Sequence, residues 1–363
     1  MFIAWRELRF ARGRFVLIGG VVALITLLVG FLAGLTGGLA YQNISSVLQL
    51  PGDRLVLQQS ENSTPSFSTS TLDKNVVQAW EQAQGIESVT PIGIIQSRAT
   101  VSGVDEPAGV ALFGLPQGAQ VAASNTLFEL TPENDDEVGL SQGAAEDLNV
   151  QVGDSIAITG TTFTVHAIGD DLWYSHTPVI TMTSQAWSES SIRVGGSGDP
   201  TVLAVSGPAD YEAISAQTGT IAQTTLSSLT ALEAFQSEIG SLALMIAMLF
   251  GISALVVGAF FTVWTMQRAG DIAVLKALGS TNGALMRDSL GQALIVLVFG
   301  IAVGLVAVLG LGALAGQALP FVVSPLTTLA PAAVMVVLGL MGAVFALRSV
   351  THADPLTALG SNR

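Results

Sequence analysis

Three long stretches without a charged residue dominate the pattern of polar and apolar positions in this chain. Their borders are Arg14 and Asp53, Glu238 and Arg268, and Asp288 and Arg348. A helix needs about 20 apolar residues to cross a membrane, so each of the first two stretches holds one span. The third is too long for one helix and contains prolines, which end helices, so it holds two. The predicted spans are 15–41, 239–266, 290–316 and 328–347.

Basic residues gather in the short segments beside these spans. Nine of the 13 Lys and Arg residues lie in 1–14, 267–289 and 348–363, which four spans place on one side of the membrane. The positive-inside rule makes that side the cytoplasm, with both termini in it. Segment 42–238 then faces outward, and 317–327 is a short outer loop. Segment 42–238 has a net charge of −19 and the rest of the chain +5, which sum to the −14 of the whole chain.

Residues 1–14 carry Phe2, Trp5 and Phe10 among arginines, and we expect an interfacial segment in contact with membrane lipids. A cleaved signal peptide is the alternative, because an Arg-rich flank, an apolar run and the small residues at 38–40 follow in that order. The apolar run is longer than the central region of a usual signal peptide. We therefore favour a first membrane span.

Segment 42–238 mixes the periodicities of strands and helices, which predicts one extracellular α+β domain. Ile156 and Ile158 before a turn, and Phe163 and Val165 after it, alternate with other residues as in a half-exposed hairpin. The other predicted strands are 54–58, 89–101, 109–114, 178–182 and 202–205. The predicted helices are 72–84, 139–149, 209–217 and 227–238. The chain has no cysteine, so this domain needs an ordinary apolar core in place of disulfides.

The segment after the second span is short, flanked by basic residues and apolar along one side. It reads Gln-Arg-Ala-Gly-Asp-Ile-Ala-Val-Leu-Lys-Ala-Leu-Gly-Ser over 267–280. It resembles the R-E-I-A-V-L-K-A-L-G-A signature of MacB/FtsX-type ABC transporter permeases, with Gly-Asp in place of the usual Arg-Glu. The resemblance implies that this short helix contacts an ABC ATPase subunit. The residues that would make this contact are Asp271, Ile272, Val274, Leu275, Lys276 and Leu278.

The outer segment carries a second resemblance to the same family. Residues 140–154, which begin Leu-Ser-Gln-Gly and end Val-Gly-Asp, resemble the extracellular core domain of MacB-type permeases. Together with spans split 1+3, this implies a permease that pairs with a second copy of itself and with ATPase subunits. No Gly-x-x-x-x-Gly-Lys-Ser/Thr motif occurs in the sequence, so we expect the partner to bind ATP. We expect no catalytic residues, no cofactor of its own and no nucleic-acid partner.

Glycine recurs at every fourth position near the end of the first span, at Gly30, Gly34 and Gly38. Small residues at this spacing let helix backbones approach closely. One interpretation is packing between spans of one subunit. The other is a dimer seam, which the resemblance favours because permeases of this family are symmetric dimers with the first span near the two-fold axis.

The compact members of this family include the Hrt-type haem exporters of Gram-positive bacteria. The resemblance to them implies haem as the substrate, taken from the outer leaflet of a bacterial plasma membrane. Haem iron accepts Met, Glu, Tyr or His ligands, and Glu238 and Met245 share one helix face, so either could bind it. The candidate substrate residues are Tyr41, Glu233, Phe235, Glu238, Leu242 and Met245. Each of these residues also has a purely structural interpretation. Glu238 could lie where the second span meets water, Met245 could pack against lipid or other spans, and Tyr41 could belong to the aromatic belt at the membrane surface.

Several alternatives stay open. Another lipophilic compound, a peptide or a lipoprotein could be the substrate. An FtsX-like transducer, which controls a cell-wall enzyme and transports nothing, is a different class of function. The polar segment 170–176 is either a metal site or a solvated loop, and so is the acidic run 133–137. Residues 43–45 match a glycosylation sequon, which we set aside in a bacterial-looking family.

Overall fold

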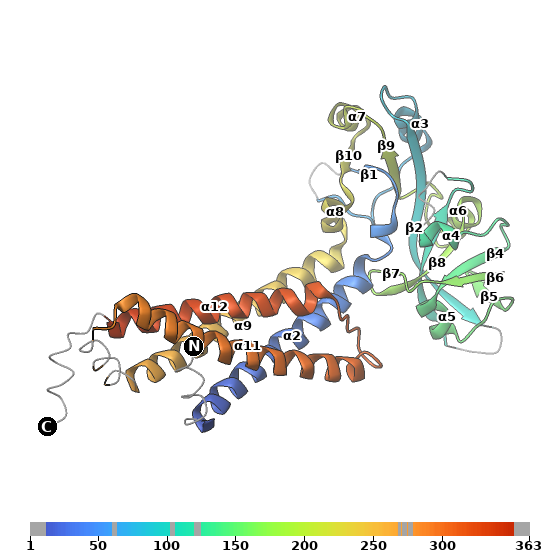
Figure 1. The fold of residues 1–363 in the computed structure, drawn as a ribbon. Helices are drawn as coiled ribbons and strands as arrows, with labels where there is room; N and C mark the ends of the chain where they lie inside the picture. Colours follow the sequence, from blue (N-terminus) through green and yellow to red (C-terminus); the bar gives the residue numbers. More distant parts are fainter. Residues whose placement is uncertain are drawn as a thin grey trace. The chain divides into compact units, whose positions relative to one another are not determined.

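The chain folds into two compact units, which Figure 1 shows as ribbons. The membrane unit consists of Met1–Gly38 and Gly240–Arg363, and the α+β unit of Leu39–Ile239. This computed structural model describes residues 12–59, 64–101, 106–119, 125–267, 270, 274 and 279–351. Each unit is described by itself below.

Four long helices confirm the predicted membrane-spanning part. Each contains a stretch that is long and apolar enough to cross a membrane, so the chain is a multi-pass membrane protein. They are α2 (Arg12–Ile44), α9 (Glu233–Gln267), α11 (Asn282–Ala315) and α12 (Pro325–Thr351). The α+β domain is inserted between the first and the second of them, as predicted.

The prolines near the last span act differently from the prediction. We expected Pro320, Pro325 and Pro331 to separate two spans, with the last helix starting at residue 328. Instead α12 begins at Pro325 and contains Pro331. The first main-chain N–H groups of a helix have no partner within it, so a proline there costs little. Pro331 follows in the second turn, where it removes a single main-chain donor.

The glycines near the end of α2 pack against residues of the same chain. A Cβ atom on Gly34 would collide with the Phe321 ring, and one on Gly38 would collide with the main chain of Pro320. A Cβ on Gly30 would lie 2.8 Å from Val308 Cγ2. The main-chain N–H of residue 322 donates to the carbonyl oxygen of Gly34 at 3.1 Å. Packing within one subunit therefore accounts for this glycine spacing, and the dimer seam stays a prediction.

A different face of α2 is uncovered in the single chain. Leu17, Leu24 and Leu28 are all more than half exposed, whereas Ile18 and Val22 on the opposite side are buried. In α9 the buried positions occur only in the second half of the helix, from Ser253 onward. Lipid or a second copy of the chain must cover such apolar surface within a membrane.

The α+β unit is built on a ten-stranded sheet with the order β10-β1-β9-β2-β3-β8-β4-β6-β5. Strand β2 also pairs with β5, so β2, β3, β8, β4, β6 and β5 close into a ring, and β7 pairs with β8. The strands are β1 (Arg54–Gln58), β2 (Ser88–Val101), β3 (Ala108–Leu115), β4 (Glu137–Ser141), β5 (Ser155–Ile158), β6 (Thr161–Gly169), β7 (Trp173–Tyr174), β8 (Thr177–Thr183), β9 (Val202–Ser206) and β10 (Thr220–Gln223).

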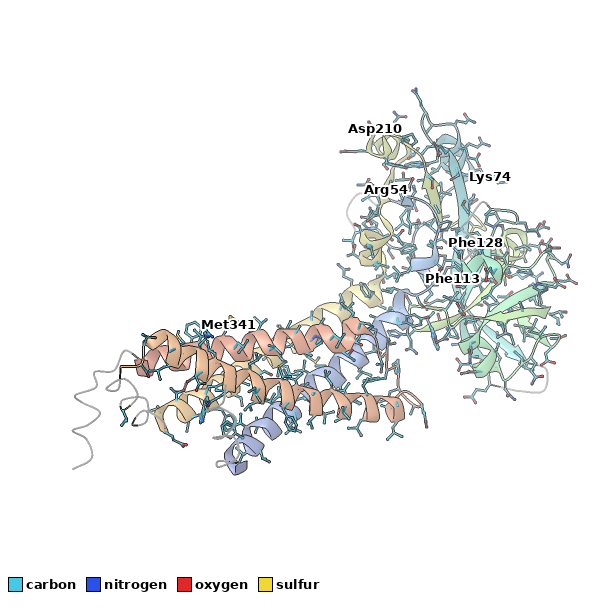
Figure 2. All side chains as sticks on the ribbon, viewed as in Figure 1. Arg54, Lys74, Phe113, Phe128, Asp210 and Met341 are labelled. Atoms are coloured by element: carbon cyan, nitrogen blue, oxygen red, sulfur yellow. The ribbon has the colours of Figure 1, made fainter. Side chains whose placement is uncertain are left out.

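Short helices join and cover these strands. They are η1 (Val47–Gln49), α3 (Lys74–Glu81), α4 (Thr126–Glu129), α5 (Gln142–Leu148), α6 (Ser184–Arg193), α7 (Tyr211–Thr218), α8 (Thr225–Ser228) and η2 (Leu229–Ala231). Alternate residues of β3 enter two different cores, because successive strand residues face opposite sides. Leu112 packs with the residues of the β5–β6 hairpin. Phe113 packs in the other core, on which Phe128 of α4 also lies (Figure 2).

Two predicted helices are wrong in part. Residues 139–141 form the end of β4, and α5 begins only at Gln142, because the hydroxyl of Ser141 accepts a hydrogen bond from Ala144 and caps the helix there. The predicted helix 227–238 is interrupted at Leu232, which has an extended backbone between η2 and α9. The predicted hairpin is confirmed as β5 and β6, with Ile156 paired with Phe163.

One tight contact fixes how α6 packs on the sheet. Gly93 of β2 and Gly114 of β3 are directly paired, and the indole of Trp187 in α6 occupies the space above both. A Cβ atom on either glycine would collide with Trp187, which is itself buried. Gly109 also lies on β3, but a Cβ there would come no closer than 3.7 Å to another residue.

We therefore expect Gly114→Val to destabilise the chain by about 1–3 kcal/mol, the usual cost of overpacking a core. Thermal unfolding of the purified chain in detergent measures this effect, and Gly109→Ala is the matched control. Equal melting temperatures for the two variants would show that α6 moves away from the sheet at no cost.

Candidate functional site

Two predicted candidates, Glu238 and the 170–176 segment, meet in the α+β unit. Glu238 lies in the second turn of α9, and His176 lies in the turn between β7 and β8. Asn43 comes from the last turn of α2. We name these three residues the Asn43–His176–Glu238 cluster.

The turn that carries His176 has an unusual backbone. Ser175 and His176 both have positive φ angles, of 46° and 64°, between the paired residues Tyr174 and Thr177. Two successive residues with positive φ make the tight turn that suits a two-residue hairpin. This geometry directs both main-chain N–H groups of the turn to the end of α2: Ser175 donates to the carbonyl of Asn43 at 3.1 Å, and His176 donates to that of Gln42 at 2.9 Å.

These bonds satisfy carbonyl groups that every helix end leaves without a partner. Further contacts fasten the same segment to α2 and the residues after it. The Tyr41 hydroxyl donates to the Asp171 carbonyl at 2.7 Å, and the Ser46 hydroxyl donates to that of Trp173 at 2.8 Å. The 170–176 segment is therefore a fixed attachment of the α2 end, which neither of our two interpretations anticipated.

The side chains of the cluster surround the Glu238 carboxylate. His176 Nε2 lies 2.8 Å from Glu238 Oε1, and Asn43 Nδ2 donates to Glu238 Oε2 at 2.9 Å. Both carboxylate oxygens thus have a partner. The side chains of His176 and Glu238 are about one third exposed, whereas Asn43 is fully buried.

Hydrogen bonding in the cluster restricts the His176 ring. Asn43 Nδ2 is also 2.9 Å from His176 Nε2, and Asn43 Oδ1 is buried with no hydrogen-bond partner in the described part of the chain. An ionised carboxylate only accepts hydrogen bonds. With Glu238 ionised, Nε2 therefore carries the proton and donates to Oε1, and the Asn43 amide donates to Oε2.

Another acidic side chain of the 170–176 segment, that of Asp171, is partly buried. Asp171 Oδ1 accepts a hydrogen bond from the Trp173 indole at 2.6 Å. Burial raises the pKa of Asp171, and this indole hydrogen bond opposes the rise. Burial likewise raises the pKa of Tyr174, which packs edge-on to the Phe113 ring. Asp171 is thus bonded within its own segment, and the Tyr174 ring is packed in the core.

The structure separates the remaining predicted substrate residues. Glu233 accepts hydrogen bonds from the hydroxyls of Ser66 and Ser68 at 2.9 and 3.2 Å. Phe235 packs against the core of the α+β unit and is partly buried, so it is no free stacking ring. Met245 is half exposed on α9, and Leu242 is partly buried.

Sequence reasoning missed Asn43, whose only sequence signal was a glycosylation sequon.

Among the described residues, no group of three or more His, Cys, Asp or Glu side chains could hold a metal ion. The acidic run has bonds of its own: Asn134 donates to Glu137 at 3.1 Å, and the Thr183 hydroxyl donates to Asp135. A ligand with a single metal centre and its own equatorial donors, as in a porphyrin, needs only one or two protein atoms.

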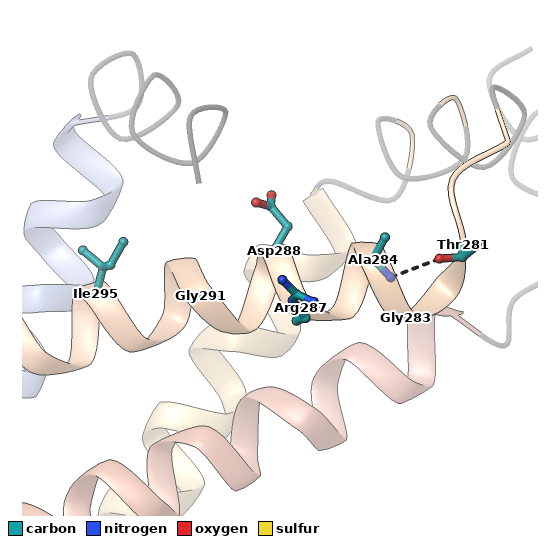
Figure 3. Close-up of a pocket in the computed structure, with 7 residues that line it drawn as sticks. All are labelled: Thr281, Gly283, Ala284, Arg287, Asp288, Gly291 and Ile295. Carbon is teal, nitrogen blue, oxygen red and sulfur yellow. Dashed lines mark hydrogen bonds between the residues drawn. The ribbon is translucent and has the colours of Figure 1, made fainter.

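The predicted ATPase contact falls mostly outside the described residues, which is true of Asp271, Ile272, Leu275, Lys276 and Leu278. Val274 is described and more than half exposed. Just after this segment, a cavity of about 730 Å³ lies at the start of α11 (Figure 3). Thr281 caps the helix by accepting a hydrogen bond from Ala284 N. The residues that line the cavity are Thr281, Gly283, Ala284, Arg287, Asp288, Gly291 and Ile295.

Comparison with protein families matches both units. Residues 16–221 match the sequence model of the MacB-like periplasmic core domain. Residues 243–355 match that of the FtsX-like permease C-terminal domain. The first match covers more than half of the chain.

Individual relatives extend over the whole chain. A protein of Staphylococcus haemolyticus named "Putative hemin transport system permease protein HrtB" is 27% identical over 99% of each chain. One of Staphylococcus epidermidis with the same name is 25% identical over 100% of each. Among solved structures, the periplasmic region of MacB from Actinobacillus actinomycetemcomitans aligns with a TM-score of 0.34 and 11% identity, over 53% of this chain and 97% of that one.

Proposed function

This chain belongs to the MacB/FtsX-type family of ABC transporter permeases, and we propose that it exports haem as the membrane subunit of a bacterial efflux pump. The observation that carries the choice of substrate is the full-length similarity to permeases named for hemin transport. The described geometry is compatible with this choice, because a partly exposed carboxylate can serve as a ligand to iron.

Within this proposal, Glu238 and Met245 are the first candidates to contact the haem iron. Both lie on α9, and the half of α9 that contains them has no buried residue in the single chain. The Glu238 carboxylate already has His176 and Asn43 as partners. Ferric iron would take the place of one of these hydrogen bonds. Tyr41 is a further candidate, and its hydroxyl would have to give up its hydrogen bond to the Asp171 carbonyl.

The pump also needs ATP hydrolysis and a second permease. A permease of this family implies an ABC ATPase partner, and in this proposal that partner binds and hydrolyses ATP. That subunit contacts segment 267–289 on the cytoplasmic side, where the positive-inside rule also puts both termini. Closure of two ATPases then moves two copies of the permease against each other and drives the substrate outward.

Haem binding tests the substrate directly. We expect the purified permease with its ATPase to give a specific Soret band on titration with haemin. The double variant Glu238→Ala/Met245→Ala should bind haemin at least about 100-fold more weakly, because even outer-shell partners change metal affinity by about 10- to 100-fold.

The matched control for that titration is Met248→Ala, since Met248 is also exposed on α9. It should bind haemin like the unmodified protein and protect cells equally against toxic haemin. A protein without a specific haemin spectrum, in cells whose haemin tolerance does not depend on it, would exclude haem. The alternatives would then be another lipophilic compound, a peptide or lipoprotein, or FtsX-like control of a cell-wall enzyme.

Coupling to the ATPase tests the predicted contact segment. Leu275→Asp puts a charge among apolar residues that would lie against the partner, so we expect ATPase activity and export to fall by about tenfold or more while insertion into the membrane is unchanged. Leu226→Asp is the control, because Leu226 is exposed on α8 in the α+β unit. Full ATPase co-purification and export by Leu275→Asp would contradict the proposed contact.

Pairing of two copies is tested by cross-linking, which is simple because the chain has no cysteine. If the uncovered face of α2 meets its copy, Leu24→Cys should form a disulfide-linked dimer in membranes under mild oxidation. Val22→Cys should not, because Val22 is buried within the chain. Absence of the Leu24→Cys dimer would mean that lipid covers this face.

A further inference from the structure

The hydrogen-bond partners of Glu238 affect how a bound haem iron would be released from this carboxylate. Both oxygens of the carboxylate are engaged within the α+β unit, by His176 Nε2 at 2.8 Å and by Asn43 Nδ2 at 2.9 Å. Coordination of an iron centre by this carboxylate requires at least one oxygen lone pair directed at the metal. Each carboxylate oxygen has two lone pairs, but a donor 2.8 Å from Oε1 occupies one of them and withdraws electron density from the other, so it weakens the bond of that oxygen to a metal.

His176 is the partner that can be exchanged. Asn43 is fully buried and also bonded to the Leu39 carbonyl, so its amide is held in place by the α2 end. The imidazole of His176 is about one third exposed, whereas Asn43 is buried, so the His176 ring is the partner with room to move. Its main chain is held by the bond to Gln42, so the ring stays within reach of Glu238 when it moves.

We propose that His176 is a positioning residue that competes with the iron of haem for the Glu238 carboxylate and takes the carboxylate back when the substrate is released. This inference rests on the proposed function. In the unloaded protein His176 holds Oε1, and Asn43 holds Oε2 in both states. Capture of the substrate exchanges one hydrogen bond for one coordination bond, so Glu238 has a partner throughout.

Competition predicts a gain of affinity when the competitor is removed. His176→Ala should bind haemin about tenfold more tightly and export it more slowly, a change of about 1.4 kcal/mol in binding. His176→Gln keeps a donor on the side chain and should restore most of the lower affinity. His166→Ala is the control, because His166 lies on β6 beside Glu137, at 3.7 Å, and outside the cluster.

A second probe separates competition from a general loosening of the site. Metal-free protoporphyrin IX has the shape of haem but no metal for Glu238 to bind, so its affinity should be the same, within about twofold, for His176→Ala and the unmodified protein. An equal gain for both porphyrins, or a haemin affinity in His176→Ala that is unchanged or lower, would overturn the role of His176. Such results leave haem export itself intact, whereas an unmodified protein without haemin binding would refute the proposed function.

A measurement on the unmodified sequence covers the case in which His176→Ala does not assemble. The chain has only three histidines, so nitrogen-15 labelling of histidine gives a simple NMR spectrum. Gallium protoporphyrin IX is a diamagnetic mimic of haemin. The His176 Nε2 resonance is assigned as the one that is missing from the spectrum of His176→Gln. Addition of the gallium porphyrin should shift this resonance. An unchanged resonance at saturation with the gallium porphyrin would show that the bond between His176 and Glu238 persists and would overturn the proposal.

Discussion

The main-chain carbonyl groups at the end of α2 need hydrogen-bond donors from outside the helix, and this need determines where the β7–β8 turn lies. The last turn of α2 leaves carbonyl oxygens without donors inside the helix, and the β7–β8 turn supplies two main-chain N–H groups for them. That supply depends on Ser175 and His176 adopting positive φ angles, which non-glycine residues rarely do. The position of the His176 ring is therefore a consequence of capping a helix, and its pairing with Glu238 follows from it.

The same turn explains the contact between His176 and Glu238, whose side chains are both about one third exposed. A partly buried pair is a weak source of stability by itself, because desolvation offsets much of the attraction. Here Glu238, His176 and Asn43 come from three elements that are far apart in sequence, and their bonds specify one arrangement of those elements. We therefore interpret the cluster as a set of contacts that holds the end of α2, the β7–β8 turn and the start of α9 in one arrangement, in agreement with its role in the proposed transport cycle.

The sequence predicted the four spans and the inserted α+β domain because both depend on strong, regular signals. Three long, strongly apolar stretches without charge have the length and composition of membrane spans, and the alternation around Ile156 and Phe163 is typical of a hairpin. Glu238 could be singled out as the acid at the start of a span. Asn43 and His176 could not be predicted as its partners. The turn that brings them together has positive φ angles at Ser175 and His176, and neither residue is a glycine, which would have signalled such a turn. The glycine spacing in α2 predicted close packing, but spacing alone does not say which neighbour fills the space, and here it is Phe321 and Pro320.

The strand order of the α+β unit sets the sequence in which it can assemble during synthesis. The ring formed by β2 to β6 and β8 uses residues 88–183 and can close as soon as these have emerged. β1 is made earlier, yet its two neighbours are β9 and β10, which are made last. An unpaired strand edge invites wrong partners while it waits. β10 ends only ten residues before α9 begins, at Gln223 and Glu233. The last strand of the sheet and the second membrane span are thus synthesised almost together. The domain therefore has little time to rearrange before both of its ends are anchored in the membrane.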